Sequence, residues 1–178
     1  MEDVLAHDTR RGVFELVRKM PGAHLREIAR ALDLSITLVD YHLRFLAKHG
    51  LVSFTMDGEY KRCYPRYAAG DAESKAALDD MDKRVLGFLR QRVPRAVLLR
   101  LLEVEEAPHK DLLGVAGVSP STLSHHLRKM VLAGLLESAA SGYRIVDPLR
   151  VARLSVTYDI ATPDQVEAFQ RVWGEFRV

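Results

Sequence analysis

The sequence predicts a mainly α-helical protein with small β-hairpins, in which one small module occurs twice. Its 178 residues suffice for one ordinary domain or two small ones. A 48% apolar share with 28% charged residues is globular, which excludes a wholly disordered chain. Above all, the sequence matches itself when it is shifted by 84 residues. Such self-similarity indicates a duplicated unit.

The repeat is clearest when residues 25–52 are laid over residues 109–136. The matched positions include Ser35 with Ser119, His42-Leu43-Arg44 with His126-Leu127-Arg128, and Gly50-Leu51 with Gly134-Leu135. The same offset also aligns apolar residues upstream, so each unit begins well before these segments. We therefore expect both copies to contain the same elements in the same order.

Each unit is expected to begin with two helices. In copy one, apolar residues follow helical spacing from Val13 to Met20, and Pro21-Gly22 then stops the helix. A short second helix carries Ile28, Ala29 and Leu32 on one face. Copy two shows the matching pattern, with its first helix starting near Pro94.

A tight turn and a third helix follow in both copies. The turn is expected at Asp33-Leu34 in copy one and at Gly117-Val118 in copy two. Serine at the next position is a typical N-cap, and in copy two proline occupies the first helical position. Gly50 and Gly134 are expected to end the third helices.

A hairpin is predicted after each third helix. In copy one, strands over residues 51–56 and 59–64 flank an Asp57-Gly58 turn, which is a strong hairpin signal. In copy two, residues 136–139 and 143–146 form a weaker version around a turn at 140–142. Helix, helix-turn-helix and hairpin, in that order, make a winged helix-turn-helix domain.

This pattern predicts two tandem winged helix-turn-helix domains with a linker helix and C-terminal helices. The expected boundaries are domain 1 over residues 1–66, a hinge and linker helix over 67–93, domain 2 over 94–147 and a helical extension over 148–178.

Two apolar stripes outside the units leave alternatives open. The linker stripe of Leu78, Met81, Val85 and Phe88 either packs on the second unit or forms a dimer or interdomain contact. The tail is expected to form two helices, the second starting at a capping box from Thr162 to Gln165. Its stripe is either core or a dimerisation element, and comprises Val166, Phe169, Trp173 and Phe176.

Two segments carry a resemblance to known regulators. SPSTLSHHLRKMVLAGLL, from Ser119, resembles the recognition-helix segment of ArsR-type winged-helix regulators. SITLVDYHLRFLAKHGLV, from Ser35, resembles the V-x-Y-H-L pattern of archaeal winged-helix regulators. The resemblance implies dimeric repressors or activators whose third helix lies in the DNA major groove. This chain departs from that pattern in lacking the metal-sensing cysteine and His/Asp clusters, and in carrying two units.

The outward face of each third helix supplies candidate DNA contacts. Copy two has no acidic residue from Ser119 through Leu136, which favours a nucleic-acid face. Copy one carries Asp40 on that face, and a carboxylate there either accepts from a cytosine amino group or pairs with Arg44 one turn later. His42 and His126 are expected to be packed, whereas His125 points outward.

The wings supply further candidates. Lys61 and Arg62 make the first wing the more basic one, because the second wing has only Arg144. The expected DNA-binding residues are Ser35, Thr37, Tyr41, Arg44, Lys48, Lys61, Arg62, Ser119, Ser121, Thr122, Ser124, His125, Arg128 and Lys129.

The sequence therefore predicts a sequence-specific, double-stranded DNA-binding transcriptional regulator, with homodimerisation through the linker or C-terminal helices. One alternative is a protein-interaction module, such as a basal transcription or chromosome-organising adaptor. A low-specificity nucleoid protein is another. Asp40 and the balance of six basic and six acidic residues over 94–147 favour the first alternative.

Other functions find no support in the sequence. No catalytic motif is present, so no enzyme activity and no cofactor are expected. With Cys63 as the single cysteine, neither a metal site nor a regulatory disulfide is expected. No apolar run reaches 18 residues and no export signal is visible, which predicts a cytoplasmic protein without a membrane partner.

Overall fold

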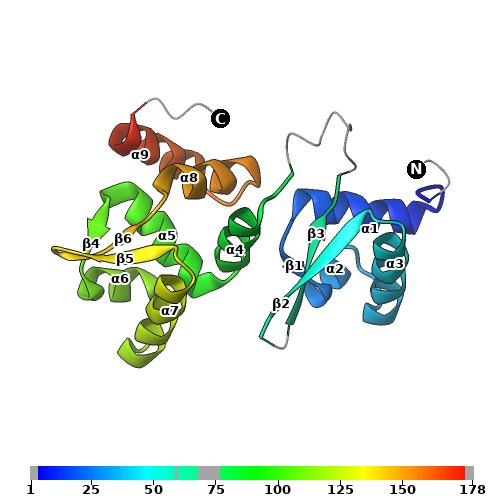
Figure 1. Ribbon diagram of the computed structural model, residues 1–178, viewed down its shortest axis with the longest axis horizontal. Helices are drawn as coiled ribbons and strands as arrows, with labels where there is room; N and C mark the ends of the chain where they lie inside the picture. Colours follow the sequence, from blue (N-terminus) through cyan, green and yellow to red (C-terminus); the bar gives the residue numbers. More distant parts are fainter. Residues whose placement is uncertain (1–3, 59, 68–76, 175–178) are drawn as a thin grey trace. The chain divides into compact units, whose positions relative to one another are not determined.

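In the computed structural model, residues 4–58, 60–67 and 77–174 are described. The chain divides into two compact units, residues 1–83 and 84–178 (Figure 1). Each unit combines helices with one small antiparallel sheet, so the predicted class of mainly helical tandem winged domains is confirmed. None of the described helices is long and apolar enough to cross a membrane.

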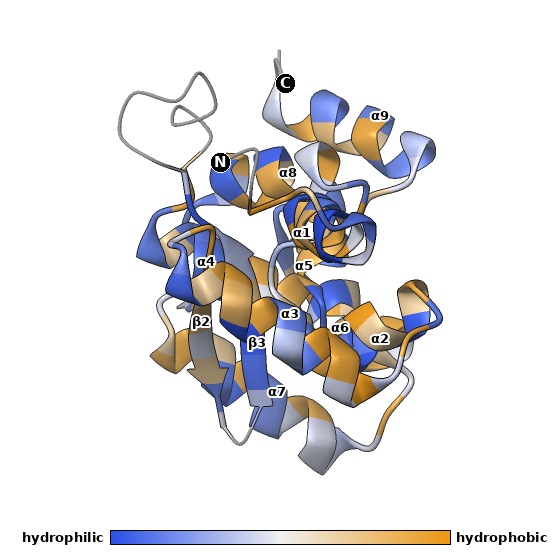
Figure 2. Ribbon diagram, turned by 90° about the vertical axis from the view of Figure 1, so that its right-hand side faces the viewer, coloured by the Kyte–Doolittle hydropathy of each residue, from blue (hydrophilic) through white to orange (hydrophobic). Residues whose placement is uncertain are grey.

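Three helices build the first unit: α1 (Asp8–Lys19), α2 (Leu25–Ala31) and α3 (Ile36–Lys48). They pack around a core to which each contributes at helical spacing, with Val17 from α1, Ile28 from α2 and Leu46 from α3 all inaccessible to solvent. Figure 2 shows the resulting alternation of apolar and polar residues along the helices. The opposite side of α3 is thereby left facing solvent.

The first sheet has three strands, in the order β1 (Ala23–His24), β3 (Tyr60–Pro65), β2 (Val52–Asp57). The sequence predicted only the hairpin of β2 and β3. Asp57, which was expected in the turn, instead pairs with Tyr60 as part of the ladder. The added strand β1 makes β3 the central strand, which governs the placement of its side chains.

The second unit repeats this arrangement with α5 (Arg92–Val104), β4 (Glu106–Ala107), α6 (His109–Ala116), α7 (Pro120–Leu132), β5 (Leu136–Ala139) and β6 (Gly142–Ile145). Both ends of α7 lie 84 residues after the corresponding ends of α3. Its sheet has the matching order β4, β6, β5. At the start of β6, a Cβ on Gly142 would collide with the Ala107 carbonyl, so glycine is required there.

The linker helix is shorter than predicted. Helix α4 spans Asp80–Leu89, whereas the apolar spacing predicted a helix from residue 73 to 92. Residues 73–76 and most of the predicted hinge at 66–72 lie outside the described residues. Gln91 adopts an extended conformation as the N-cap of α5, which separates the two helices. Val85 and Leu89 are buried. A dimer contact through this stripe stays a prediction.

The tail forms two helices, α8 (Pro148–Thr157) and α9 (Pro163–Trp173), as predicted. The Gln165 side chain accepts a hydrogen bond from the Thr162 backbone N–H at 3.1 Å, which is one half of the predicted capping box. Helix α9 packs on α5: Phe169 is fully buried, and the Trp173 indole N–H donates to the Leu102 carbonyl at 2.7 Å. Phe169 therefore belongs to the second unit's core and the half-buried Trp173 packs at its edge, whereas Phe176 lies outside the described residues.

Candidate nucleic-acid interface

The helix-turn-helix turns are equivalent in the two units. Asp33 and Gly117, which are 84 residues apart, both have positive φ, at 52° and 59°. Each turn leads into a serine N-cap whose hydroxyl accepts a hydrogen bond from the backbone N–H of the helix's third residue. Leu38 donates to Ser35 and Thr122 donates to Ser119, both at 3.2 Å. The two third helices, α3 and α7, therefore start in the same way and expose equivalent positions.

Helix α3 exposes the candidates expected of copy one, namely Ser35, Thr37, Tyr41, Arg44 and Lys48. Its main outward cation is already partnered, because Arg44 Nε donates to Asp40 Oδ2 at 2.6 Å. Of the two roles left open for Asp40, the structure therefore shows the ion pair one turn apart. An exposed pair at this spacing is worth only about 0.3–0.5 kcal/mol, so phosphate can compete for Arg44.

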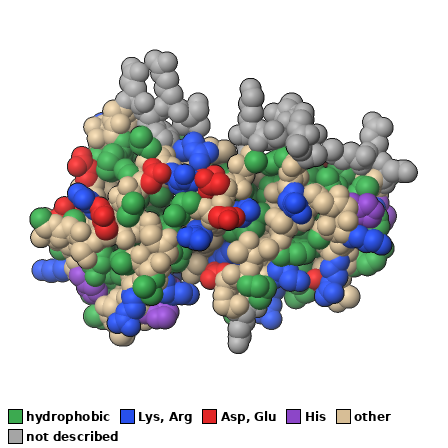
Figure 3. Space-filling view, in the orientation of Figure 1, with side chains coloured by type: hydrophobic (Ala, Val, Ile, Leu, Met, Phe, Trp, Pro, Cys, Tyr) green, Lys and Arg blue, Asp and Glu red, His purple; other side chains and the backbone are tan. Residues whose placement is uncertain are grey.

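Helix α7 exposes a different set. Its first turn is rich in hydroxyls: Ser119 Oγ lies 3.0 Å from Ser121 Oγ and 2.8 Å from Thr122 Oγ1. Ser124 Oγ lies 3.1 Å from His109 Nε2, and His125 is exposed. Lysine, arginine and histidine side chains gather over this part of the second unit in Figure 3.

The two equivalent arginines differ, because Arg44 of α3 is paired with Asp40 whereas Arg128 of α7 has no ion-pair partner among the described residues. Arg128 and Lys129 are exposed, and neither forms a salt bridge within the described parts of the chain. With no acid along this helix, both charges face solvent without neutralisation. This face can donate hydrogen bonds to phosphate or to guanine edges at no cost of breaking an ion pair.

The equivalent histidines of the two helices are packed, as predicted. His42 is 2% exposed, and both ring nitrogens lack a partner within the described residues. Burial, followed by the neighbouring His7 and Arg10, lowers the pKa of His42. His126 is half-buried, and burial followed by His125 and Lys129 lowers its pKa.

The first wing requires a correction, because Arg62 does not lie on an exposed wing tip. It is 2% exposed; Nε and Nη2 donate to Asp57 Oδ2 at 2.9 and 2.6 Å, and Nη1 donates to the Gly22 carbonyl at 2.8 Å. The physical reason is the unpredicted strand β1, which covers the side of β3 that a two-stranded hairpin would expose. Arg62 joins β3 to the turn before β1 and is unavailable to phosphate.

Lys61 is the remaining basic candidate on this wing. It is half-buried, and its ammonium lies 4.7 Å from the centre of the Phe54 ring. Such a cation–π contact still leaves the ammonium hydrogens free to reach phosphate. On the second wing Arg144 pairs with Glu137 at 2.6 Å, so that wing presents a neutralised pair.

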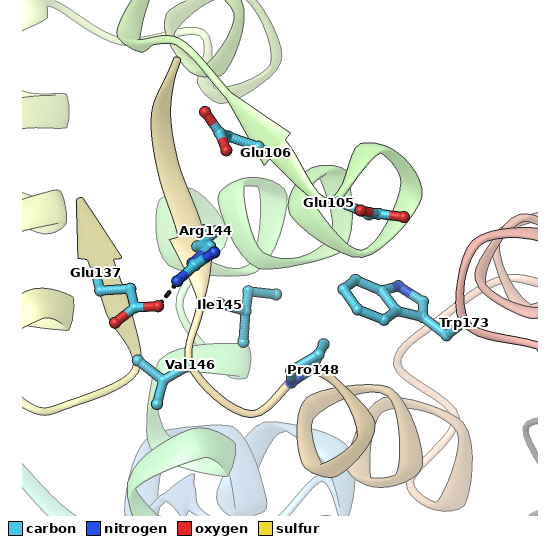
Figure 4. Close-up of a pocket in the computed structure, with 8 residues that line it drawn as sticks. All are labelled: Glu105, Glu106, Glu137, Arg144, Ile145, Val146, Pro148 and Trp173. Atoms are coloured by element: carbon cyan, nitrogen blue, oxygen red, sulfur yellow. Dashed lines mark hydrogen bonds and ion pairs between the residues drawn. The ribbon is translucent and has the colours of Figure 1, made fainter. Parts of the chain in front are cut away.

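A pocket of about 330 Å³ lies beside the second wing (Figure 4). Its wall combines carboxylates with apolar groups: Glu105, Glu106, Glu137, Arg144, Ile145, Val146, Pro148 and Trp173. Hydrogen bonds from Ser141 lower the pKa of Glu106, which keeps it ionised. The sequence did not reveal this pocket, because its residues come from separate segments. Its carboxylates disfavour a phosphate group in this pocket.

No group of three potential metal ligands occurs among the residues that the structure places. Cys63 is buried in β3, and burial raises the pKa of its thiol to about 12. The thiol therefore stays protonated and shielded at neutral pH, which makes it a poor nucleophile.

Taken together, a capped third helix, a preceding helix-turn and a following hairpin that pairs with a short earlier strand define each unit as a winged helix-turn-helix domain, and the chain as a tandem of two. Residues 7–78 match a family model described as an N-terminal HTH domain. Residues 95–138 match the model of bacterial regulatory proteins of the arsR family. The resemblance to helix-turn-helix transcriptional regulators is thus confirmed.

One relative aligns across both units. Over 147 residues the chain is 28% identical to an uncharacterized HTH-type transcriptional regulator of Methanocaldococcus jannaschii. The alignment covers 82% of this chain and 34% of that protein, so the chain spans about a third of the relative's length. No solved structure matches the chain.

Proposed function

We propose that the chain binds double-stranded DNA sequence-specifically and regulates transcription, with α7 as its main reading helix. The observation that carries this proposal is the outward face of α7, where Arg128 and Lys129 are exposed, without an ion-pair partner in the described part of the chain, beside a hydroxyl-rich, capped first turn. The two matches to helix-turn-helix families support it independently.

The other proposed contacts surround this face or belong to the first unit. Arg44, Lys48 and Lys61 supply cations from α3 and the first wing, while Thr37 and Tyr41 lie on the outward face of α3. Arg62 is removed from the set because it is buried. A homodimer would place two such chains on one duplex, and the cytoplasmic location expected from the sequence accompanies this function; both remain predictions.

A salt titration tests the proposal. With four or five cations on phosphates, log K should fall against log salt with a slope of about −4. We expect measurable binding of random duplex at low salt and tighter binding of duplexes selected from a random pool. Failure to bind any duplex at low salt would contradict the proposal.

The protein-interaction alternative is favoured by one observation, the neutralisation of Arg44 by Asp40 and of Arg144 by Glu137. These pairs weaken two of the basic sites that DNA would need. The same titration separates the candidates: an adaptor gives no duplex binding, and a low-specificity nucleoid protein binds selected and random duplexes equally.

A further inference from the structure

The start of α3 exposes apolar side chains to solvent. Ile36 is 47% exposed, Leu38 39% and Tyr41 57%. The equivalent positions of α7 hold Pro120, Thr122 and His125. Two helices with the same backbone and the same type of cap therefore present chemically different surfaces at the same place.

Ile36, Leu38 and Tyr41 lie at the part of the third helix that approaches the bases in DNA-bound helix-turn-helix domains. In helix-turn-helix domains the N-terminal residues of the third helix contact base edges in the major groove. In that groove the thymine 5-methyl is the apolar feature of the base edges, and apolar side chains are its recognised partners.

The charges near the start of α3 also favour apolar contacts with the bases over hydrogen bonds to guanine. Arg44 is the cation nearest to Tyr41 on the outward face, and its Nε is bonded to Asp40. The neighbouring Asp40 carboxylate repels guanine O6 and N7, so it disfavours guanine reading by this part of α3. Lys48, further along the same face, remains exposed for phosphate.

We infer that α3 recognises thymine methyl groups through Ile36 and Leu38, which lie on different sides of its first turn, with Tyr41 three residues after Leu38, so that the first unit selects A·T-rich sequence. The inference rests on the proposed function, and it assigns to the two units different base preferences. Helix α7, with its hydroxyls and free Arg128, reads polar base edges instead.

Deoxyuridine provides the probe, because it differs from thymidine only in lacking the 5-methyl group. Duplexes selected by the full chain are synthesised with each thymine replaced in turn. At thymines read by α3, we expect each lost methyl to weaken binding about fourfold, the value for one buried methylene-sized group.

Two variants assign the effect to α3. Ile36→Ser and Leu38→Ser, which leave no methyl group at the position, should each bind thymine and uracil equally at the base that the lost side chain contacts. Leu132→Ala is the matched control: Leu132 is an apolar residue 80% exposed near the end of α7, and its removal should leave the ratio unchanged. All three positions are solvent-accessible, so the variants are expected to fold.

The outcomes separate this inference from the proposed function. If the parent chain binds selected duplexes but is indifferent to uracil at every position, thymine reading is wrong and DNA binding stands. If uracil weakens binding equally in the parent and both α3 variants, the methyl is read elsewhere and the inference also fails. Absence of binding to all duplexes overturns the proposed function and this inference together.

Discussion

Helices α3 and α7 have the same length, the same serine cap and the same offset from their preceding turns, yet they expose different chemistry. On α3, Arg44 is paired and the first turn exposes Ile36 and Leu38; on α7, Arg128 has no ion-pair partner among the described residues and the first turn carries hydroxyls. The difference teaches that the repeat conserves the framework through its buried positions, while the outward positions set what each copy can bind.

The two wings differ in strand length and in the burial of their arginine. The first wing has six-residue strands and is fastened internally by buried Arg62, whereas the second has four-residue strands and an exposed Arg144–Glu137 pair. Both wings carry an arginine close to a carboxylate, but only the first arginine is enclosed by protein. Burial therefore decides which of the two is structural.

Replacement of Arg62 should give the largest effect. Arg62→Ala leaves Asp57 and the Gly22 carbonyl without their guanidinium, and loss of one partner of a buried pair costs about 3 kcal/mol. Arg144→Ala, its exposed counterpart, should cost less than about 1 kcal/mol. Urea unfolding, monitored by circular dichroism, measures the unfolding free energy lost in each variant.

Tryptophan fluorescence shows which unit loses stability in Arg62→Ala. The chain has one tryptophan, Trp173, which packs in the second unit. Arg62→Ala should lower the circular dichroism midpoint while the tryptophan midpoint changes little. Equal costs for Arg62→Ala and Arg144→Ala would show that burial does not separate the two wings.

Acidification should affect the first unit more than the second. The folded-state pKa of His42 is lowered below the ordinary value of 6.5, because the ring is buried near His7 and Arg10 and its edge meets Tyr41. The unfolded chain therefore takes up the proton first, and stability present above about pH 6.5 is lost as the pH falls.

Two leucine variants check the pH effect. His42→Leu should flatten the dependence of the unfolding free energy on pH between 8 and 5. His126→Leu should flatten it less, since His126 is only half-buried. A His42→Leu chain that keeps the full pH dependence would assign the effect to other groups.

Much of the framework could be predicted from sequence. The 84-residue offset located both third helices, and Ser35 and Ser119 marked their first turns because a hydroxyl before an apolar periodic segment is a strong capping signal. The two hairpins were predictable because turn-forming residues, Asp57-Gly58 and residues 140–142, separate the paired strands. Strands β1 and β4 were missed, because two residues are too few to show an alternating pattern.

The side-chain assignments of the site were less predictable, because they depend on tertiary neighbours. Arg62 looked like a phosphate-binding residue until β1 placed β3 at the centre of its sheet. Asp40 allowed two roles from sequence, and only the geometry of α3 shows its pairing with Arg44. The shorter α4 reflects the extended Gln91, which the apolar spacing alone did not indicate.

The central claim, that α7 carries the main free cationic face and α3 does not, is tested most directly by comparing Arg128→Ala with Arg44→Ala on a selected duplex. Arg128→Ala should weaken binding by about 1–3 kcal/mol if Arg128 forks onto a base. Arg44→Ala should cost less than Arg128→Ala, because the Asp40 carboxylate neutralises part of the Arg44 charge. Equal losses, or a larger loss for Arg44→Ala, would contradict the account.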